Sequence, residues 1–190
     1  MTNASTRSVH RWLTAGLLGA ETLACGATEA RAQDIIEPGT RPMWAALALG
    51  PAIGVVDVGV TQFKLEQEFG YHFSGDSSGP AIGANIGESF GSGAVVVQPG
   101  AKFWWDIQIL DDMAIYISPN AKLGYGGVFA GGASAHSFNW QVAAEGKVIL
   151  GDRGLVFFRP LALDFFAGDG FGLNGFAMRY DLMFGGGVTF

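Results

Sequence analysis

The chain has 190 residues, of which 49% are hydrophobic and 15% are charged, and it carries a formal net charge of −6 at neutral pH. This length suits one domain. The acidic balance argues against a nucleic-acid partner, because phosphate binding requires an excess of Lys and Arg. After residue 32 there is no continuous apolar run of membrane-helix length, so a membrane-spanning form of this chain would cross as strands.

Residues 1–32 have the features of a cleaved secretory signal peptide. Arg7 and Arg11 precede a nine-residue apolar stretch (12–20), and a small-x-small site (30–32) stands before Gln33. The apolar stretch is too short for a membrane-spanning helix, which needs about 20 residues. We therefore predict cleavage after residue 32 and export of the rest of the chain.

Cys25 is the only cysteine, and two outcomes are open for it. Leu23-Ala24-Cys25 partly resembles a lipoprotein processing site, in which the cysteine would carry the lipid. Cleavage after Ala32 would instead remove Cys25, so no disulfide or cysteine-based metal site would remain. The residues after that site hold fifteen acidic and eight basic side chains.

Eight segments of alternating apolar residues follow, separated by turn residues at the spacing of an up-and-down meander. We predict a flexible lead over 33–42 and a β-barrel domain over 43–190. The turns at 75–79, 111–112 and 151–154 would lie at one end, and the links at 55–59, 91–93, 127–136 and 167–174 at the other. The predicted strands are Met43–Gly54, Val60–Ser74, Pro80–Phe90, Ala94–Leu110, Met113–Gly126, Ser137–Leu150, Leu155–Phe166 and Gly175–Phe190.

Each strand sorts its side chains onto an apolar, aromatic face and a polar face. On the second strand Phe63, Phe69 and Tyr71 share one face, on which Gln67 is the exception. An eight-stranded barrel has an interior just wide enough for side chains to fill, so the many aromatic rings must point outward. A Lys or Arg on a lipid-facing surface would cost roughly 2 to 4 kcal/mol at mid-membrane, and charges are therefore expected inside.

These inward charges are predicted to pair across neighbouring strands and to produce a plugged, polar interior. The predicted lumen charge network consists of Lys64, Glu66, Glu68, Lys102, Asp106, Lys122, Glu145, Lys147, Arg179 and Asp181. On the seventh strand an unbroken alternation would place Arg159 and Asp164 on opposite faces. We interpret Pro160 as a β-bulge that resets the alternation.

The last strand carries a recognisable pattern. Its apolar face alternates up to Phe190, and Gly185, Val188 and Phe190 match the assembly signal of bacterial outer-membrane barrels, whereas Met183 stands where that signal has a polar residue. The chain thus resembles the small OmpA-, OmpX- and OmpW-like outer-membrane β-barrels of Gram-negative bacteria. The resemblance implies an all-β, eight-stranded antiparallel up-and-down transmembrane barrel, surrounded by outer-membrane lipid and inserted by the barrel-assembly machinery through its C-terminal strand.

A fold of this kind hosts several functions. Because the sequence shows no convergent catalytic set and no cofactor or metal motif, we expect a structural or cell-surface interaction role without catalysis. One alternative is a small channel or transport barrel for ions or apolar solutes, with Trp44 and Trp104 lining the interior. A further alternative is a soluble periplasmic ligand-binding barrel, in which the two faces would be exchanged.

Three weaker site candidates have ordinary structural explanations, which we favour: a polar strand end beside a turn for two histidine motifs, and loop chemistry for a third segment. His72-Phe73-Ser74, with Glu68 nearby, is similar to the motif of the outer-membrane lipid A deacylases, but it is predicted at the periplasmic end of its strand. His136-Ser137 is at the outer end without a nearby carboxylate in sequence. The segment 169–174 offers hard oxygen ligands for a cation.

Overall fold

The computed structural model describes residues 40–57, 59–110, 113–151, 153–169 and 175–190. The predicted signal peptide, Cys25 and most of the predicted lead lie outside these residues, as do residues 170–174 of the candidate cation segment. Within the described part of the chain, no helix is both long and apolar enough to cross a membrane.

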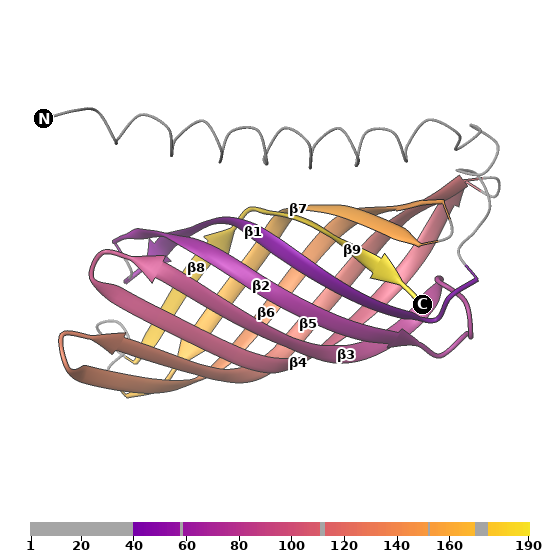
Figure 1. The fold of residues 1–190 in the computed structure, drawn as a ribbon. Helices are drawn as coiled ribbons and strands as arrows, with labels where there is room; N and C mark the ends of the chain where they lie inside the picture. Colours follow the sequence, from indigo (N-terminus) through magenta and orange to yellow (C-terminus); the bar gives the residue numbers. More distant parts are fainter. Residues whose placement is uncertain (1–39, 58, 111–112, 152, 170–174) are drawn as a thin grey trace, which may run out of the picture. The chain divides into compact units, whose positions relative to one another are not determined.

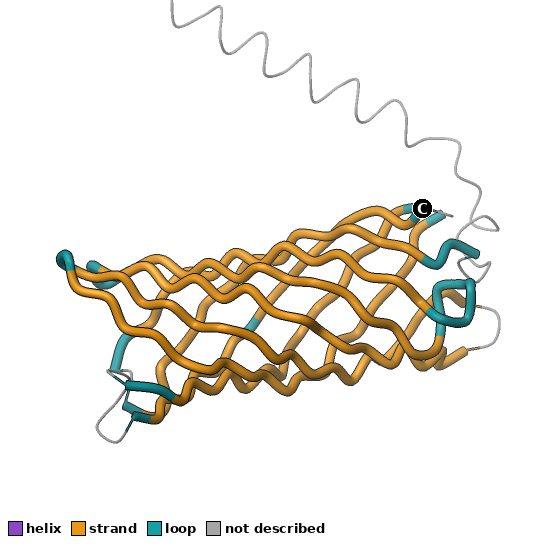
Figure 2. Tube along the Cα trace, turned by 90° about the horizontal axis from the view of Figure 1, so that it is seen from below, coloured by secondary structure: helices purple, strands orange, loops and turns teal. Residues whose placement is uncertain are grey.

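Nine β-strands form one antiparallel sheet that closes into a barrel (Figures 1 and 2). Strands β8 and β9 are two halves of one strand, because both pair with β1 on one side and with β7 on the other. The barrel is therefore eight-stranded, as predicted. The strands are β1 (Met43–Val56), β2 (Thr61–His72), β3 (Gly79–Gly91), β4 (Ala94–Leu110), β5 (Met113–Ala130), β6 (Ala133–Leu150), β7 (Gly154–Ala167), β8 (Phe176–Asp181) and β9 (Met183–Thr189).

The first and last strands close the barrel. The Phe190 amide donates to the Met43 carbonyl at 2.8 Å, and the Met43 amide donates to the Phe190 carbonyl at 3.1 Å. Among the described strands, closure pairs both edges of the sheet, which is what a spanning sheet requires, since hydrocarbon cannot hydrogen-bond to the backbone. We call the barrel end that holds Met43 and Phe190 the terminal end and the opposite end the loop end.

The link predicted at 127–136 is wrong, because β5 and β6 each continue four residues further than the sequence indicated. Only Gly131 and Gly132 separate them, with φ of +56° and +85°. Two successive residues with positive φ form the tight hairpin turn that follows the right-handed twist of paired strands. At the loop end, β5 and β6 are therefore joined by a turn of two residues.

The eighth strand divides at Leu182, whereas one continuous strand was predicted. Leu182 lies beside Pro51 of β1, which has no amide hydrogen to donate, although the Leu182 amide still donates to the Pro51 carbonyl at 3.1 Å. The backbones approach closely here: a Cβ on Gly50 would lie 1.8 Å from the Leu182 carbonyl oxygen. Pro51 and this close approach explain why the ladder is interrupted.

The bulge predicted at Pro160 is confirmed. The register between β6 and β7 shifts between Ala144 and Gly146, and Pro160 and Leu161 are consecutive exposed residues where the alternation slips. The slip turns both Arg159 and Asp164 into the barrel, where each is fully buried. A single extra residue thus allows one strand to contribute two inward charges from either side of a proline.

The outward face is apolar and aromatic, and the inward face carries the charges, as the alternation predicted. Phe63, Trp105 and Phe138 are about half exposed on the outside of the barrel, while the neighbouring Lys64, Trp104 and Asn139 are buried inside. This arrangement is the reverse of a soluble barrel with an apolar interior. It contradicts the alternative of a soluble ligand-binding barrel.

Inward glycines make room for the largest inward side chains. A Cβ on Gly70 of β2 would lie 2.1 Å from the indole of Trp44, which is itself 98% buried. The indole can therefore lie flat against the neighbouring strand only because position 70 has no side chain.

We expect Gly70→Ala to lower the unfolding temperature of the barrel, because overpacking a filled interior costs about 1–3 kcal/mol. Gly146→Ala is the matched control, since an added Cβ there meets no atom within 4 Å. The temperature at which the folded band disappears on a detergent gel measures both variants. Equal temperatures for the two would contradict the close packing of Trp44 on β2.

Candidate functional site: the charged barrel interior

Twelve charged side chains face the interior of the barrel, and none is more than 4% exposed. Six are cationic and six are anionic among the described residues, so the set has no net charge. The cations are Lys64, Lys102, Lys122, Lys147, Arg159 and Arg179; the anions are Glu66, Glu68, Asp106, Glu145, Asp164 and Asp181. We call these twelve residues the lumen charge set.

Arg159 is the centre of the acidic half of this set. Its guanidinium donates to Glu66 at 2.8 Å, to Glu68 at 2.5 Å and, through Nε, to Glu145 at 2.9 Å. Glu68 also receives a hydrogen bond from Lys102, whose Nζ lies 3.4 Å from Glu66. The planar guanidinium has five N–H donors, which suits it to three carboxylates at once.

Asp164 is the centre of a second group of polar contacts, nearer the loop end. Its carboxylate accepts from Gln98 at 2.6 Å, from Asn139 at 2.7 Å and from Arg179 at 3.0 Å. Lys64 lies 3.4 Å from the same carboxylate and donates to Asp181 at 2.5 Å. Neutral amides thus complete the hydrogen bonding of a buried carboxylate that the cations alone would leave unfinished.

Asp106 forms a third cluster toward the terminal end. Its Oδ2 lies 2.6 Å from both Lys147 Nζ and His72 Nε2, while His72 Nδ1 lies 3.3 Å from the Pro42 carbonyl oxygen. The Trp44 ring packs 4.6 Å from the His72 ring and 4.8 Å from Lys147 Nζ. Pro42, which directly precedes β1, is thereby in contact with a side chain of the interior.

Lys122 differs from the other five cations. Its Nζ is buried without a hydrogen-bond partner among the described residues, and its carboxylate contact, to Asp164, is 3.9 Å long. The cost of burying an ammonium group without hydrogen bonds is high. Lys122 is therefore the least satisfied charge of the set.

All ten residues predicted for the network lie inside the barrel, but their pairing differs from the prediction. Several pairs join strands that are not neighbours: Lys64 of β2 contacts Asp181 of β8, and Lys147 of β6 contacts Asp106 of β4. The reason is that long inward side chains from different walls meet in a narrow lumen. Most of the ion pairs therefore cross the interior, and fewer join neighbouring strands of the wall.

The predicted network did not include Arg159 and Asp164, although each of them has three charged partners in it. The signal that identifies them is Pro160, because a bulge at that position turns both side chains inward. The predicted network also left out the amides of Gln98, Asn139 and Gln141, which lie inside on the polar faces of their strands. In the sequence, only their position in the alternation along each strand distinguishes these amides from exposed polar residues.

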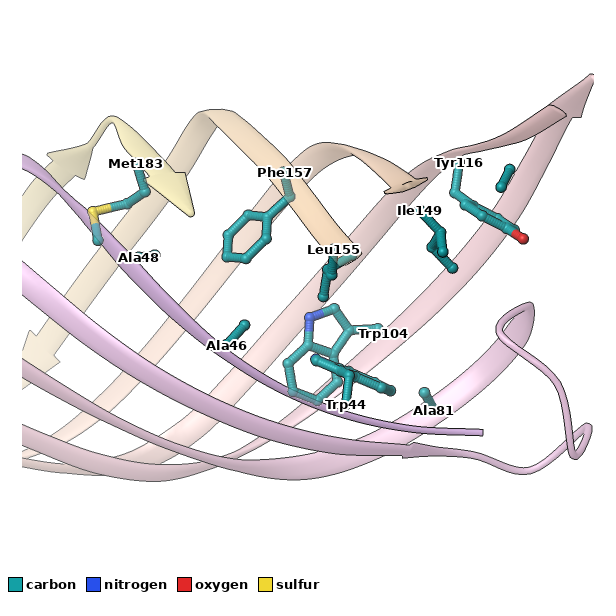
Figure 3. Close-up of a cluster of buried hydrophobic side chains, with 11 residues drawn as sticks. Trp44, Ala46, Ala48, Ala81, Trp104, Tyr116, Ile149, Leu155, Phe157 and Met183 are labelled. Atoms are coloured by element: carbon teal, nitrogen blue, oxygen red, sulfur yellow. The ribbon is translucent and has the colours of Figure 1, made fainter. Parts of the chain in front are cut away.

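Apolar side chains fill the interior at both ends of the charge set. At the terminal end Trp44 and Trp104 meet edge to face, with ring centroids 5.0 Å apart, and Figure 3 shows their rings directed toward one another inside the barrel. Tyr116, Phe157 and other buried residues complete this cluster. Toward the loop end a smaller cluster is built on Val96, Phe166 and Ala177.

Neither histidine motif assembles a proton-transfer chain. Ser74, in the exposed turn after β2, donates to Asp76 and to the Ser78 carbonyl, while His72 contacts Asp106 inside the barrel. Glu68 is occupied by Arg159 and Lys102. The motif similar to the lipid A deacylases is therefore divided between three separate sets of partners.

The second motif is divided between the two faces of β6. His136 is outside, where it contacts Tyr125 and lies 3.5 Å from the Ser134 hydroxyl, whereas Ser137 points inward and donates to the Gly126 carbonyl. Among the described residues no group of three or more His, Cys, Asp or Glu side chains is arranged to hold a metal ion.

Asp76 stabilises the turn between β2 and β3. Its partial burial raises the pKa of this carboxyl, but the hydroxyls of Ser78 and Ser74 and the Ser78 amide donate to it and hold its pKa below the ordinary value. A carboxyl with a lowered pKa stabilises the folded state above its unfolded pKa, and the contribution is lost as the pH falls through the folded value. This contribution to the turn is therefore lost in acid.

The residues of the predicted assembly signal lie on both faces of β9. Val188 and Phe190 are outside and about half exposed, and Gly185 is inside, where an added Cβ would lie 2.3 Å from the Phe157 ring. Met183, at the position where the signal has a polar residue, is fully buried in the apolar cluster of the terminal end.

Comparison with known proteins agrees with this architecture. No family model matches the chain, and no curated protein matches it by sequence. Six chains of solved structures are similar to it in fold, and three of them are described below. The fold is that of the small eight-stranded outer-membrane barrels.

Neisserial surface protein A aligns with a TM-score of 0.59 and 12% identity over 78% of this chain and 97% of its own. The N-terminal barrel domain of Pseudomonas aeruginosa OprF gives 0.52 and 9% over 81% and 100%. Ail, the attachment invasion locus protein of Yersinia pestis, gives 0.50 and 10% over 79% and 99%. At these identities the likeness concerns the fold alone.

We expect Arg159→Met to destabilise the barrel strongly. Removing one member of a buried charge cluster costs about 3–5 kcal/mol, and here three glutamates would lose their guanidinium. Lys122→Met is the matched control, because Lys122 makes no hydrogen bond and its loss should cost much less. The midpoint of urea unfolding in detergent micelles measures both. A smaller loss for Arg159→Met than for Lys122→Met would show that Arg159 is not the centre of the set.

Proposed function

We propose that this protein is a structural or cell-surface interaction protein of the bacterial outer membrane, with a plugged interior and no catalytic activity. The observation that carries the proposal is the balanced, fully buried lumen charge set, closed by aromatic rings at the terminal end. An interior filled in this way provides rigidity and leaves no evident space for a substrate. Function is then left to the outer surface and the loop end.

The topology supports this location. Outward aromatic residues surround the barrel, and the terminal end holds the turn between β2 and β3, the paired ends of β4 and β5, and those of β6 and β7. In an outer membrane the terminal end would face the periplasm and the loop end the exterior. Two of the structurally similar proteins are named for the cell surface or for attachment, which makes a surface role for this chain a reasonable proposal.

The plug is tested by conductance. We expect the wild-type protein to show little conductance in planar bilayers, and Lys64→Ala or Glu66→Ala to raise it and to lower thermal stability, because each removes a member of the charge set. Leu123→Ala, on the outward face, is the control and should change neither. Unchanged conductance and stability in both inward variants would contradict the plug, and steady wild-type conductance would favour a small channel instead.

Location and assembly are tested together. After separation of the inner and outer membranes, we expect the outer-membrane fraction to contain a band whose gel mobility shifts on boiling, as a folded barrel requires. Deleting Phe190 should reduce that band several-fold, because the proposed assembly signal would be lost and with it recognition by the barrel-assembly machinery. Recovery of the wild-type chain in the soluble periplasm, without a shift, would contradict the proposed location.

A further inference from the structure

Gln67 is the polar exception on the apolar outward face of β2. Its side chain is exposed at the middle of the strand and makes no hydrogen bond within the part of the chain that the structure describes. Phe63 and Tyr71 stand four residues away on the same face. With a rise of about 3.3 Å per residue and a strand tilt of about 45°, each ring is roughly 9 Å from Gln67 along the membrane normal.

Glu88 of β3 is a second polar group on this face. Gln67 is paired with Ile86, and Leu65 with Glu88, so Gln67 and Glu88 are diagonal neighbours. Such neighbours are about 7–8 Å apart. Glu88 is partly exposed on the outside of the barrel and is the only charged residue on the outward face of the described strands.

The surface beside this pair is hollow. A shallow depression of about 500 Å³ lies over β9, β1, β2 and β3, with Gln67 in its wall and the small residues Ala45, Ala84 and Gly186 among its lining. Small residues in a membrane-facing surface allow another backbone to approach closely, and polar side chains there hydrogen-bond across the interface.

Lipid cannot satisfy Gln67, because acyl chains offer no hydrogen bonds at this depth and the polar headgroups lie near the aromatic rings. The surface of another protein can supply hydrogen-bond partners for the Gln67 side chain. A second copy of this chain presents the two groups that are needed, a carboxamide that donates and a carboxylate that accepts. A two-fold axis along the membrane normal, passing between the two residues, brings each Gln67 to the Glu88 of the other copy.

We propose that the outward face of β2 and β3 is a dimer interface between two copies of this barrel, held by two reciprocal hydrogen bonds between Gln67 and Glu88. The hollow at Ala45, Ala84 and Gly186 lets the two walls approach. This inference goes beyond the proposed function, since it depends on membrane embedding and not on whether the interior is plugged.

The experiment measures dimer dissociation in detergent micelles by sedimentation equilibrium, for the wild-type protein and three variants. We expect Gln67→Leu and Glu88→Leu each to weaken the dimer at least about tenfold, since two hydrogen bonds are lost in either case. Glu88→Gln should retain it, because an amide can still accept from Gln67. A mobility shift on boiling shows that each variant is folded.

Cross-linking in native membranes identifies the partner. In a Cys25→Ser background, Ile86→Cys should yield a cross-linked species of twice the monomer mass, and Leu123→Cys on β5 should not. A monomeric wild-type protein in both experiments would overturn the proposal. So would a cross-link from Ile86→Cys to a protein of another mass, or a dimer that Gln67→Leu leaves unchanged.

Discussion

Charge balance inside a narrow barrel is the constraint on which the rest of this structure depends. Eight strands leave an interior that side chains fill, so an ionised group placed there must find a partner within reach. Six cations and six anions meet this condition, and Arg159 and Asp164 distribute them into overlapping clusters. Most of the ion pairs join strands that are not hydrogen-bonded to each other, and they therefore hold the wall together across the lumen as well as around it.

Because the charges inside the barrel balance, the excess of acidic residues lies elsewhere in the chain. After residue 32 there are fifteen acidic and eight basic side chains, and the lumen charge set takes six of each. Nine acidic and two basic residues remain, and by sequence they fall in the lead, in the turns and links, and at Glu88. The net negative charge is thus carried by residues outside the lumen charge set.

The fold does not by itself assign a function, but the arrangement of side chains narrows the choice. Ser74 and Ser137 point away from the histidines next to them in sequence, so a serine–histidine pair suited to hydrolysis is not formed at either motif. The inside is occupied by paired charges and by tryptophan rings. Chemical specificity is therefore most readily placed on the outside, where Gln67 and Glu88 are polar groups on a mainly apolar wall.

Alternation along the chain was sufficient to predict the eight strands, the outward aromatic face and the inward position of ten of the twelve lumen charges. The reason is that strand periodicity is a local property, visible in consecutive residues of the sequence. It could not predict that β5 and β6 extend to Gly131 and Gly132, since glycine-rich segments carry little alternation. It also could not predict which charges meet. Arg159 reaches Glu66 and Glu68 only because the closed barrel brings β7 and β2, which are not neighbours, to face the same lumen. Partners of this kind depend on distances across the lumen, and those distances exist only once the barrel has closed.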